Sequence, residues 1–197
     1  MNPSAEPSAP ASAKREHLLD TAWELFCQSG YRAVGIDTLL AKAGVAKMTL
    51  YNHFGSKEDL IAAAMEKKGE EILAGFDATI AAAGKSPTKR LSAVFDWLEG
   101  WFSSADFAGC AFVKAIGEYR LDSDKPRRAA TAFKQALQQR IEALCGEAEL
   151  RNAPALARQF MLLIDGATVH ADLHRRSAYA QDARAAARAL IESASRV

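Results

Sequence analysis

Amines, hydroxyls, an amide and an imidazole are gathered between Lys47 and Lys57, where the chain reads KMTLYNHFGSK. Such side chains can donate hydrogen bonds to phosphate oxygens and to the edges of base pairs, which is the chemistry of DNA contact. The stretch from Arg32 to Lys57 carries four basic residues against the single acid Asp37, a local formal charge of +3. Since the whole chain has a net charge of only +1, we expect DNA contact to be concentrated in this stretch.

Two short helical segments are predicted to position these side chains. The first spans residues 37–43 and ends at Gly44, and the second spans residues 47–54 and ends at Gly55. A glycine directly after the last periodic residue is a helix stop signal. Two brief helices joined by a glycine-containing turn are typical of a helix-turn-helix.

The second segment has an inward and an outward face. Leu50 and Phe54 are four residues apart, so they lie on one side of a helix and are predicted to pack against Trp23 and Leu39. The outward face of the same helix is then formed by Lys47, Met48, Tyr51 and Asn52. A recognition helix enters the major groove with such a face turned towards the bases.

The stretch from Gly30 to Leu60 resembles the N-terminal DNA-binding region of the TetR family of bacterial regulators, whose pattern runs I-A-x-x-A-G-V-S-x-x-T-L-Y-x-H-F-x-S-K-x-x-L. The matching positions are Ala43-Gly44-Val45, Thr49-Leu50-Tyr51, His53-Phe54, Ser56-Lys57 and Leu60. The resemblance implies an all-α protein with an N-terminal three-helix DNA-binding domain and a C-terminal helical domain for ligand binding and dimerisation. The implied partners are double-stranded operator DNA, a small-molecule effector and a second copy of the chain.

The resemblance also assigns roles around the second short helix. It implies phosphate contacts for Thr49, Tyr51, His53 and Lys57, and places Lys47, Met48 and Asn52 nearest the bases. Gly35 stands where the family usually has a capping Ser or Thr, so one phosphate contact is expected to be missing or to pass to Thr38. Leu40 replaces a small alanine, which predicts a slightly wider helix crossing.

The remaining segments divide the chain into a tail and two domains. Residues 1–13 contain three of the six prolines and no apolar periodicity, so they are predicted to be a flexible tail. The DNA-binding domain is assigned to 14–60 and the effector and dimerisation domain to 61–197, with a connector helix at about 56–82 that starts at a Ser56/Asp59 capping box. Further helices are predicted near 87–103, 109–121, 126–145, 154–176 and 180–195, nine in all.

The last two helices are the candidate dimer helices, again by resemblance. In the first, Phe160, Leu163, Ala167 and His170 are predicted to share a face. The second is rich in alanine, which permits close approach of a neighbouring helix, at Ala183, Ala186, Ala187, Leu190 and Ala194.

A concentration of aromatic residues in the middle of the C-terminal half predicts a pocket for a hydrophobic or aromatic effector. Its candidate apolar lining is Trp97, Trp101, Phe107, Phe112 and Tyr119, and its candidate polar groups are Cys110, Glu118, Asp165 and His170. Taken singly, each aromatic residue is more commonly ordinary core, whereas as a set these residues are the best candidates for a pocket lining. Cys110 at a helix start could be a sensing thiol or a buried, inert one.

Other functions are weakly indicated. His170 and His174 have the spacing of paired metal ligands, but no third ligand is identified and no metal is predicted. A DNA-binding module without a ligand response stays open, as does an enzyme using Cys110, or Glu118 with His170. We expect no enzyme, no catalytic residue and no cofactor.

The three cysteines lack a paired motif and no apolar run is long enough to cross a membrane, which predicts a cytoplasmic protein without membrane partners.

Overall fold

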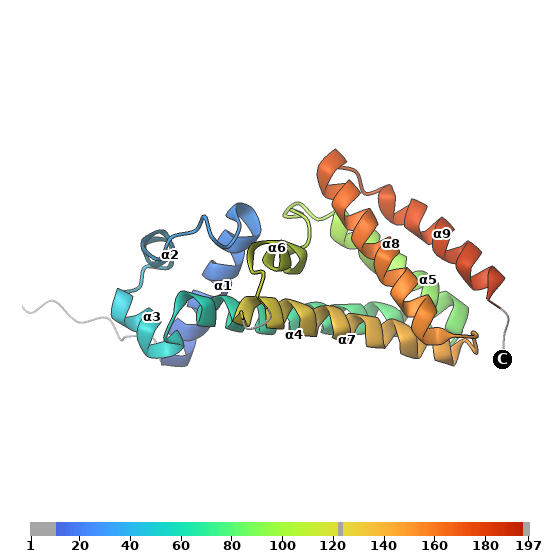
Figure 1. The fold of residues 1–197 in the computed structure, drawn as a ribbon, viewed down its shortest axis with the longest axis horizontal. Helices are drawn as coiled ribbons and strands as arrows, with labels where there is room; N and C mark the ends of the chain where they lie inside the picture. Colours follow the sequence, from blue (N-terminus) through green and yellow to red (C-terminus); the bar gives the residue numbers. More distant parts are fainter. Residues whose placement is uncertain (1–10, 122–123, 195–197) are drawn as a thin grey trace, which may run out of the picture.

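The computed structural model describes residues 11–121 and 124–194 (Figure 1). These residues form nine α-helices and no β-strand, so the predicted all-α class is confirmed. The helices are α1 (Ala11–Ser29), α2 (Ile36–Ala43), α3 (Lys47–Phe54), α4 (Lys57–Ala82), α5 (Pro87–Phe102), α6 (Ala111–Glu118), α7 (Lys125–Glu147), α8 (Ala153–His174) and α9 (Tyr179–Ser193).

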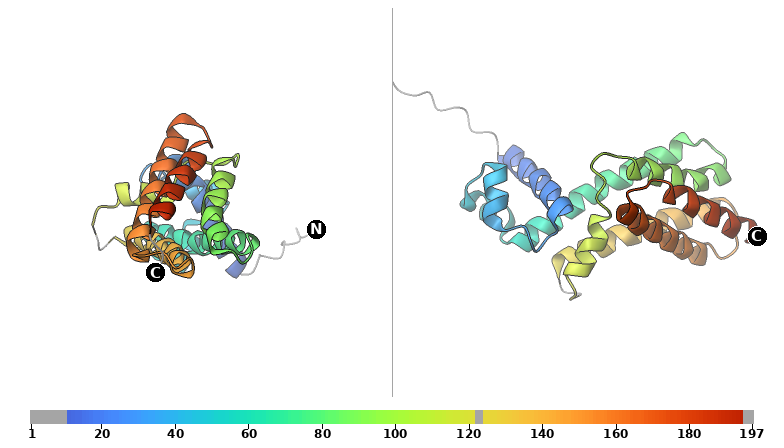
Figure 2. Two further views of the ribbon diagram at one scale, coloured as in Figure 1. Left: turned by 90° about the vertical axis from the view of Figure 1, so that its right-hand side faces the viewer. Right: turned by 90° about the horizontal axis from the view of Figure 1, so that it is seen from above.

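The first three helices form a small unit at one end of the molecule, which Figure 2 shows separated from the C-terminal helices. Its core is formed by apolar side chains that are almost completely buried, including Leu18, Phe26, Leu39 and Leu50. Helix α2 ends at Gly44, whose φ of +62° lies in the left-handed region that favours glycine. The tight turn that follows brings α3 back against α2.

Helix α4 connects this unit to the rest of the chain. The Ser56 hydroxyl oxygen accepts a hydrogen bond from the Asp59 backbone N–H at 3.1 Å, which confirms the predicted helix start. From there α4 runs along the length of the molecule beside α7, and α5, α8 and α9 pack at the far end (Figure 1). The short helix α6 lies between the two ends of the molecule.

Two helices, α1 and α6, differ from the predicted bounds by three residues at one end, whereas the ends of the other helices lie within two residues of the predictions. Helix α1 begins at Ala11 instead of residue 14, because alanine favours the helical state and Pro10 is the last helix-breaking residue before it; the rest of the predicted tail, residues 1–10, lies outside the described residues. Helix α6 spans Ala111–Glu118 instead of 109–121. Gly109 has a φ of +75°, which is not helical, and Tyr119 is extended.

No helix within the described ranges is long and apolar enough to cross a membrane.

Candidate DNA-binding surface and ligand cavity

Helix α3 has the two faces that the sequence predicts. Leu50 and Phe54 are buried, with 0% and 7% of their surfaces exposed, whereas Met48 and Tyr51 are 69% and 40% exposed. Lys47 and Asn52 are also exposed. The outward face therefore presents an amine, a thioether, a phenol and an amide to solvent, while the inward face holds α3 on its own domain.

The remaining predicted DNA contacts surround this face. Thr38 is exposed on α2, and Thr49 and His53 are half-buried on α3. Gly35 occupies the N-cap of α2 without a side-chain hydrogen bond, as expected where glycine replaces a capping Ser or Thr. The DNA-contact roles of these residues stay predictions.

Lys57, which is predicted to contact a DNA phosphate, also has a partner within the chain that the sequence did not indicate. Its ammonium donates a hydrogen bond to the Tyr31 carbonyl oxygen at 2.7 Å. Partial burial lowers the pKa of Lys57, although Glu58 and Glu118 act in the opposite direction. Lys57 therefore also holds the turn between α1 and α2 against the start of α4.

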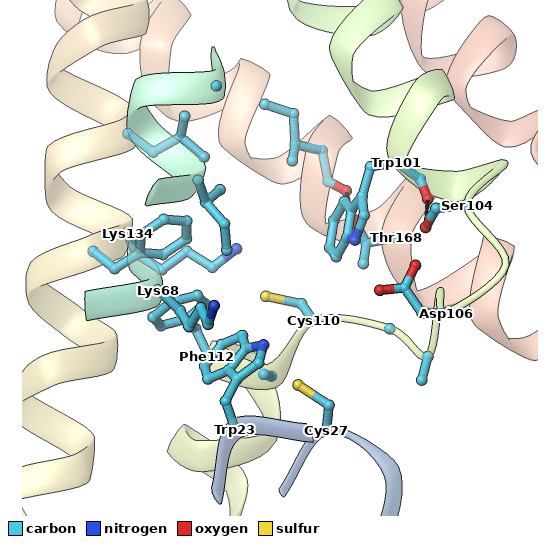
Figure 3. Close-up of a pocket in the computed structure, with 18 of the residues that line it drawn as sticks. Trp23, Cys27, Lys68, Trp101, Ser104, Asp106, Cys110, Phe112, Lys134 and Thr168 are labelled. Atoms are coloured by element: carbon cyan, nitrogen blue, oxygen red, sulfur yellow. Dashed lines mark hydrogen bonds between the residues drawn. The ribbon is translucent and has the colours of Figure 1, made fainter. Parts of the chain in front are cut away.

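A cavity of about 390 Å³ lies between α1 and the C-terminal helices (Figure 3). This size is in the range of small-molecule pockets. Side chains from α1, α4, α5, α6, α7 and α8 form its walls, together with the loop between α5 and α6. The lining is Trp23, Glu24, Cys27, Gln28, Lys68, Ile72, Gly75, Trp97, Trp101, Ser104, Asp106, Ala108, Gly109, Cys110, Ala111, Phe112, Phe133, Lys134, Leu137, Ile164 and Thr168.

Four of the nine predicted ligand residues belong to this lining: Trp97, Trp101, Cys110 and Phe112. The two indole rings are stacked, with centroids 6.1 Å apart. Phe112 stacks on Phe133 at 3.8 Å. Cys110 is the buried N-cap of α6. Their position at the cavity is established by the structure, and their contact with an effector stays a prediction.

The structure places three other predicted residues behind or away from the cavity. Phe107 packs edge-on against Trp101 at 5.2 Å, and Asp165 forms an ion pair with Lys134, which takes the lining position instead. His170 is exposed and stacks on Tyr179 at 5.4 Å. Helical period alone did not reveal which neighbour would cover each side chain.

Glu118 and Tyr119 lie at the joint where α6 meets the N-terminal unit formed by α1, α2 and α3, which is the predicted DNA-binding unit. The Glu118 carboxylate accepts hydrogen bonds from the backbone N–H groups of Tyr31 at 3.0 Å and Arg32 at 2.6 Å. Gly30 has a φ of +80°, in the left-handed region that favours glycine, and a Cβ there would come within 2.9 Å of this carboxylate. Tyr119 packs on Tyr31 with ring centroids 6.2 Å apart. Both residues therefore lie outside the cavity lining.

Two further hydrogen bonds strengthen this joint. The Tyr31 hydroxyl donates to the Ala111 carbonyl at 3.1 Å, and the Lys114 ammonium donates to the Cys27 carbonyl at 3.0 Å. Helix α6 is thus bonded to Cys27 near the end of α1 and to the turn that follows α1, and its N-terminal residues also line the cavity.

Several cavity residues were not predicted from the sequence. Trp23 was expected beneath α3, but its ring lies 5.7 Å from Phe112 and lines the cavity. Cys27, Phe133, Lys134 and Thr168 were also missed. Trp23 and Cys27 are four residues apart and therefore share a face of α1, but the opposite walls of the cavity come from distant segments, which the sequence did not place there.

Two of the three thiols lie in surroundings that disfavour the thiolate form. Burial raises the pKa of Cys27 to about 11, against a partial opposing effect of Lys114. Burial also raises the pKa of Cys145 to about 11. A high pKa leaves little reactive thiolate at neutral pH.

Neither the metal site nor the acid–base pair considered from the sequence is assembled. His170 and His174 stack in parallel with ring centroids 5.8 Å apart, and in the described part of the chain no group of three or more His, Cys, Asp or Glu residues could hold a metal ion. Glu118 is engaged with backbone amides of the DNA-binding unit, whereas His170 lies on the exposed surface of α8.

The residues predicted to share a face of α8 differ in their exposure. Phe160 and Ala167 are buried within their own chain, at 0% and 8% exposure, whereas His170 is exposed. Phe160 and Ala167 are therefore not available to a second copy of the chain. The exposed apolar residues are Leu162, Val169 and Leu173, at 74%, 55% and 69%. Their spacing forms one stripe along the helix. Helical spacing shows which residues share a face of α8, but not whether that face meets the core or the solvent.

Comparison with known proteins identifies the N-terminal unit. The sequence model for bacterial regulatory proteins of the tetR family matches residues 18–64. The transcriptional activator FasR of Mycolicibacterium smegmatis is 32% identical over 93 residues, 46% of this chain and 42% of FasR. The transcriptional repressor KstR2 of Rhodococcus jostii is 36% identical over 74 residues, 38% of this chain and 32% of KstR2.

The resemblance in fold extends much further along the chain. A TetR-family transcriptional regulator from Streptomyces coelicolor superposes with a TM-score of 0.82 at 28% identity, over 92% of this chain and 95% of that chain. Fold and site together define a helix-turn-helix protein with a helical C-terminal body. The chain belongs to the TetR family of bacterial regulatory proteins. It matches less than half the length of FasR and of KstR2.

Proposed function

We propose that this protein is a one-component transcriptional regulator that binds operator DNA as a homodimer and responds to a small hydrophobic or aromatic effector. The observation that carries the proposal is the outward face of α3, where Met48 and Tyr51 are exposed while Leu50 and Phe54 fix the helix from behind. A helix held in this way can insert into the major groove without losing its own packing.

The side chains on this face have suitable chemistry for DNA. Lys47 can donate to guanine O6 or N7, Asn52 can pair with adenine, and Met48 can contact a thymine methyl group. Phosphate contacts would come from Thr49, Tyr51, His53, Lys57 and Thr38 at the edges of the face. Lys57 also donates to the Tyr31 carbonyl, so its contribution to DNA binding would combine its charge with the positioning of the turn between α1 and α2.

Dimerisation is supported by the exposed stripe of α8. Leu162, Val169 and Leu173 are large apolar side chains that a second copy of the chain would cover. A two-fold dimer would place two α3 helices so that they read successive major grooves, about 34 Å apart. Aspartate in place of Leu162 and Leu173 is expected to yield monomers in analytical ultracentrifugation, with weaker operator binding.

Effector response is supported by the contacts between the cavity and the DNA-binding unit. The same helix α6 lines the cavity at Ala111 and Phe112 and holds the end of α1 through Glu118. Trp23 and Cys27 of α1 line the cavity directly. A ligand that binds better to a conformer with a displaced α1 would weaken DNA binding by its differential affinity, typically about 5- to 150-fold.

The proposal also covers the direction of regulation, which is either repression or activation. The relatives include an activator and repressors. We infer repression relieved by the effector, because repressors are more numerous among those relatives. A reporter gene under the control of the operator would separate the two directions.

The first experiment is fluorescence anisotropy with DNA from upstream of the protein's own gene, excess competitor DNA and a salt series. Tight binding that resists competitor is expected, together with loss of affinity in the Lys47→Ala variant. Binding that competitor abolishes at every upstream fragment, and at fragments selected from random DNA, would overturn the assignment as a sequence-specific regulator.

A further inference from the structure

The charged groups that line the cavity are unequally paired. The Lys134 ammonium forms an ion pair with Asp165. Lys68 is paired with Asp20 at 3.1 Å and Glu71 at 2.8 Å. Each lysine of the lining therefore already has a carboxylate partner, and a ligand entering the cavity meets no uncommitted cation among these groups.

The two acids of the lining, Glu24 and Asp106, differ in whether they have a basic partner. Glu24 lies 3.4 Å from the Lys42 ammonium. Asp106, in the loop between α5 and α6, is exposed to solvent and has no hydrogen bond or ion pair within the described ranges. Figure 3 shows its carboxylate turned towards the side of the cavity on which Trp101 and Cys110 lie. Lys114 is nearby, but its ammonium is held by the Cys27 and Ala108 carbonyls and is not part of the lining.

Aromatic rings form much of the remaining wall. Trp97 and Trp101 are stacked with centroids 6.1 Å apart, and Trp23 lies 5.7 Å from Phe112 on the opposite side. The negative ring faces of tryptophan attract cations more strongly than those of other aromatic residues. A cavity whose wall holds several indoles and one carboxylate without an ion-pair partner is thus suited to a positive charge on an apolar body.

An anionic ligand would meet the opposite situation. The ammonium groups that it could contact already have their charge balanced, Lys134 by Asp165 and Lys68 by Asp20 and Glu71. Their attraction for a further anion is therefore reduced, and the ligand would also face Asp106. A cation instead meets Asp106, whose charge is not balanced by an ion pair.

We propose that the effector of the cavity is an organic cation, with its apolar part against Trp97 and Trp101 and its positive charge near Asp106. This inference rests on the proposed function, because it names the ligand class for the same cavity. Asp106 is the residue that distinguishes a cation from a neutral molecule of equal shape.

The test compares three probes of one shape by tryptophan fluorescence titration: benzyltrimethylammonium, its neutral carbon isostere neopentylbenzene, and the anion benzylsulfonate. The cation is expected to bind most tightly. Asp106→Asn should weaken cation binding by about 5-fold and leave the neutral isostere unchanged. Trp101→Leu should weaken cation binding by about 5-fold, and Trp101→Phe should weaken it less because a ring is retained.

Asp182→Asn, which removes an exposed carboxylate from α9, is the matched control and should not change the affinity for any probe. Thermal melting of each variant verifies that it is folded. Benzylsulfonate binding as tightly as the cation, equal cation affinity with and without the Asp106 carboxylate, or no cation binding would each overturn the inference. Failure of the proposed function would be seen separately, as the absence of competitor-resistant DNA binding by the wild-type protein without any probe.

Discussion

The outward face of α3 and the cavity are built in contrasting ways. The face comes from a single helix, and its large side chains extend into solvent, with Met48 69% exposed. The cavity is assembled from six helices, and its walls include core residues such as Phe112 and Phe133, which are 2% and 8% exposed. The face therefore presents groups that need no support from distant segments, whereas the cavity exists only through tertiary packing.

This difference separates two kinds of functional residue. Substitutions on the α3 face should change DNA affinity without changing stability, because few contacts within the chain are lost. Substitutions in the cavity and at the α6 joint should change stability and ligand response together. Glu118 shows this combination, since one carboxylate holds two backbone amides of the DNA-binding unit.

The largest expected effect contrasts the two sides of α3. Leu50→Ala should lower the free energy of unfolding by about 2–5 kcal/mol, because it removes buried methyl groups and leaves a cavity. Met48→Ala should change it by less than about 0.5 kcal/mol. Urea unfolding followed by circular dichroism measures both. Equal destabilisation by the two substitutions would contradict the assignment of inward and outward faces.

The second prediction concerns Cys27, one of the two thiols in the cavity lining. Since burial raises the pKa of Cys27 to about 11 from an ordinary 9.0, alkylation by iodoacetamide at pH 8 should be roughly 100-fold slower than that of an unfolded thiol. The protonated thiol is the favoured form, so its contribution to stability is complete below pH 9.0 and is lost as the pH rises towards 11.

Mass spectrometry of a Cys110→Ala, Cys145→Ala variant measures the rate at Cys27 alone, and the same variant in urea is the control. Modification of the folded protein as fast as the unfolded one would show that Cys27 is not protected in the cavity wall.

The third prediction tests the joint between the two regions. Glu118→Gln should lower the free energy of unfolding by about 1–2 kcal/mol, because an amide cannot accept the two backbone N–H bonds as strongly as a carboxylate. Urea unfolding measures the loss. Glu70→Gln changes an exposed acid of α4 and serves as the control. An unchanged stability in Glu118→Gln would remove Glu118 from the contact between α6 and α1.

The smallest expected effect is on DNA affinity. Lys47→Ala should weaken operator binding by about 3- to 10-fold and reduce the salt slope by about 1, because one phosphate-neutralising or base-contacting cation is lost. Tyr51→Phe should have a smaller effect, since only a hydroxyl is removed. Anisotropy over a salt series measures both, with Lys85→Ala, far from α3, as the control. An unchanged slope in Lys47→Ala would exclude that residue from the DNA interface.

Local sequence signals determined the helices and the outward face of α3. Gly44 and Gly55 end their helices, Ser56 caps α4 with Asp59, and the spacing of Leu50 and Phe54 sets which side of α3 is exposed. These features involve residues at most a few positions apart, so the chain carries them in contiguous segments and they can be read directly from the sequence.

Only the tertiary structure decided the partners of the remaining side chains. Glu118 was predicted to bind a ligand, yet it holds the backbone of residues 87 and 86 positions earlier in the chain, Tyr31 and Arg32. Trp23 was expected under α3 but lines the cavity, and the exposed side of α8 proved to be Leu162, Val169 and Leu173. The physical reason is that helical period establishes which residues share a face, whereas the position of the other helices decides what that face meets.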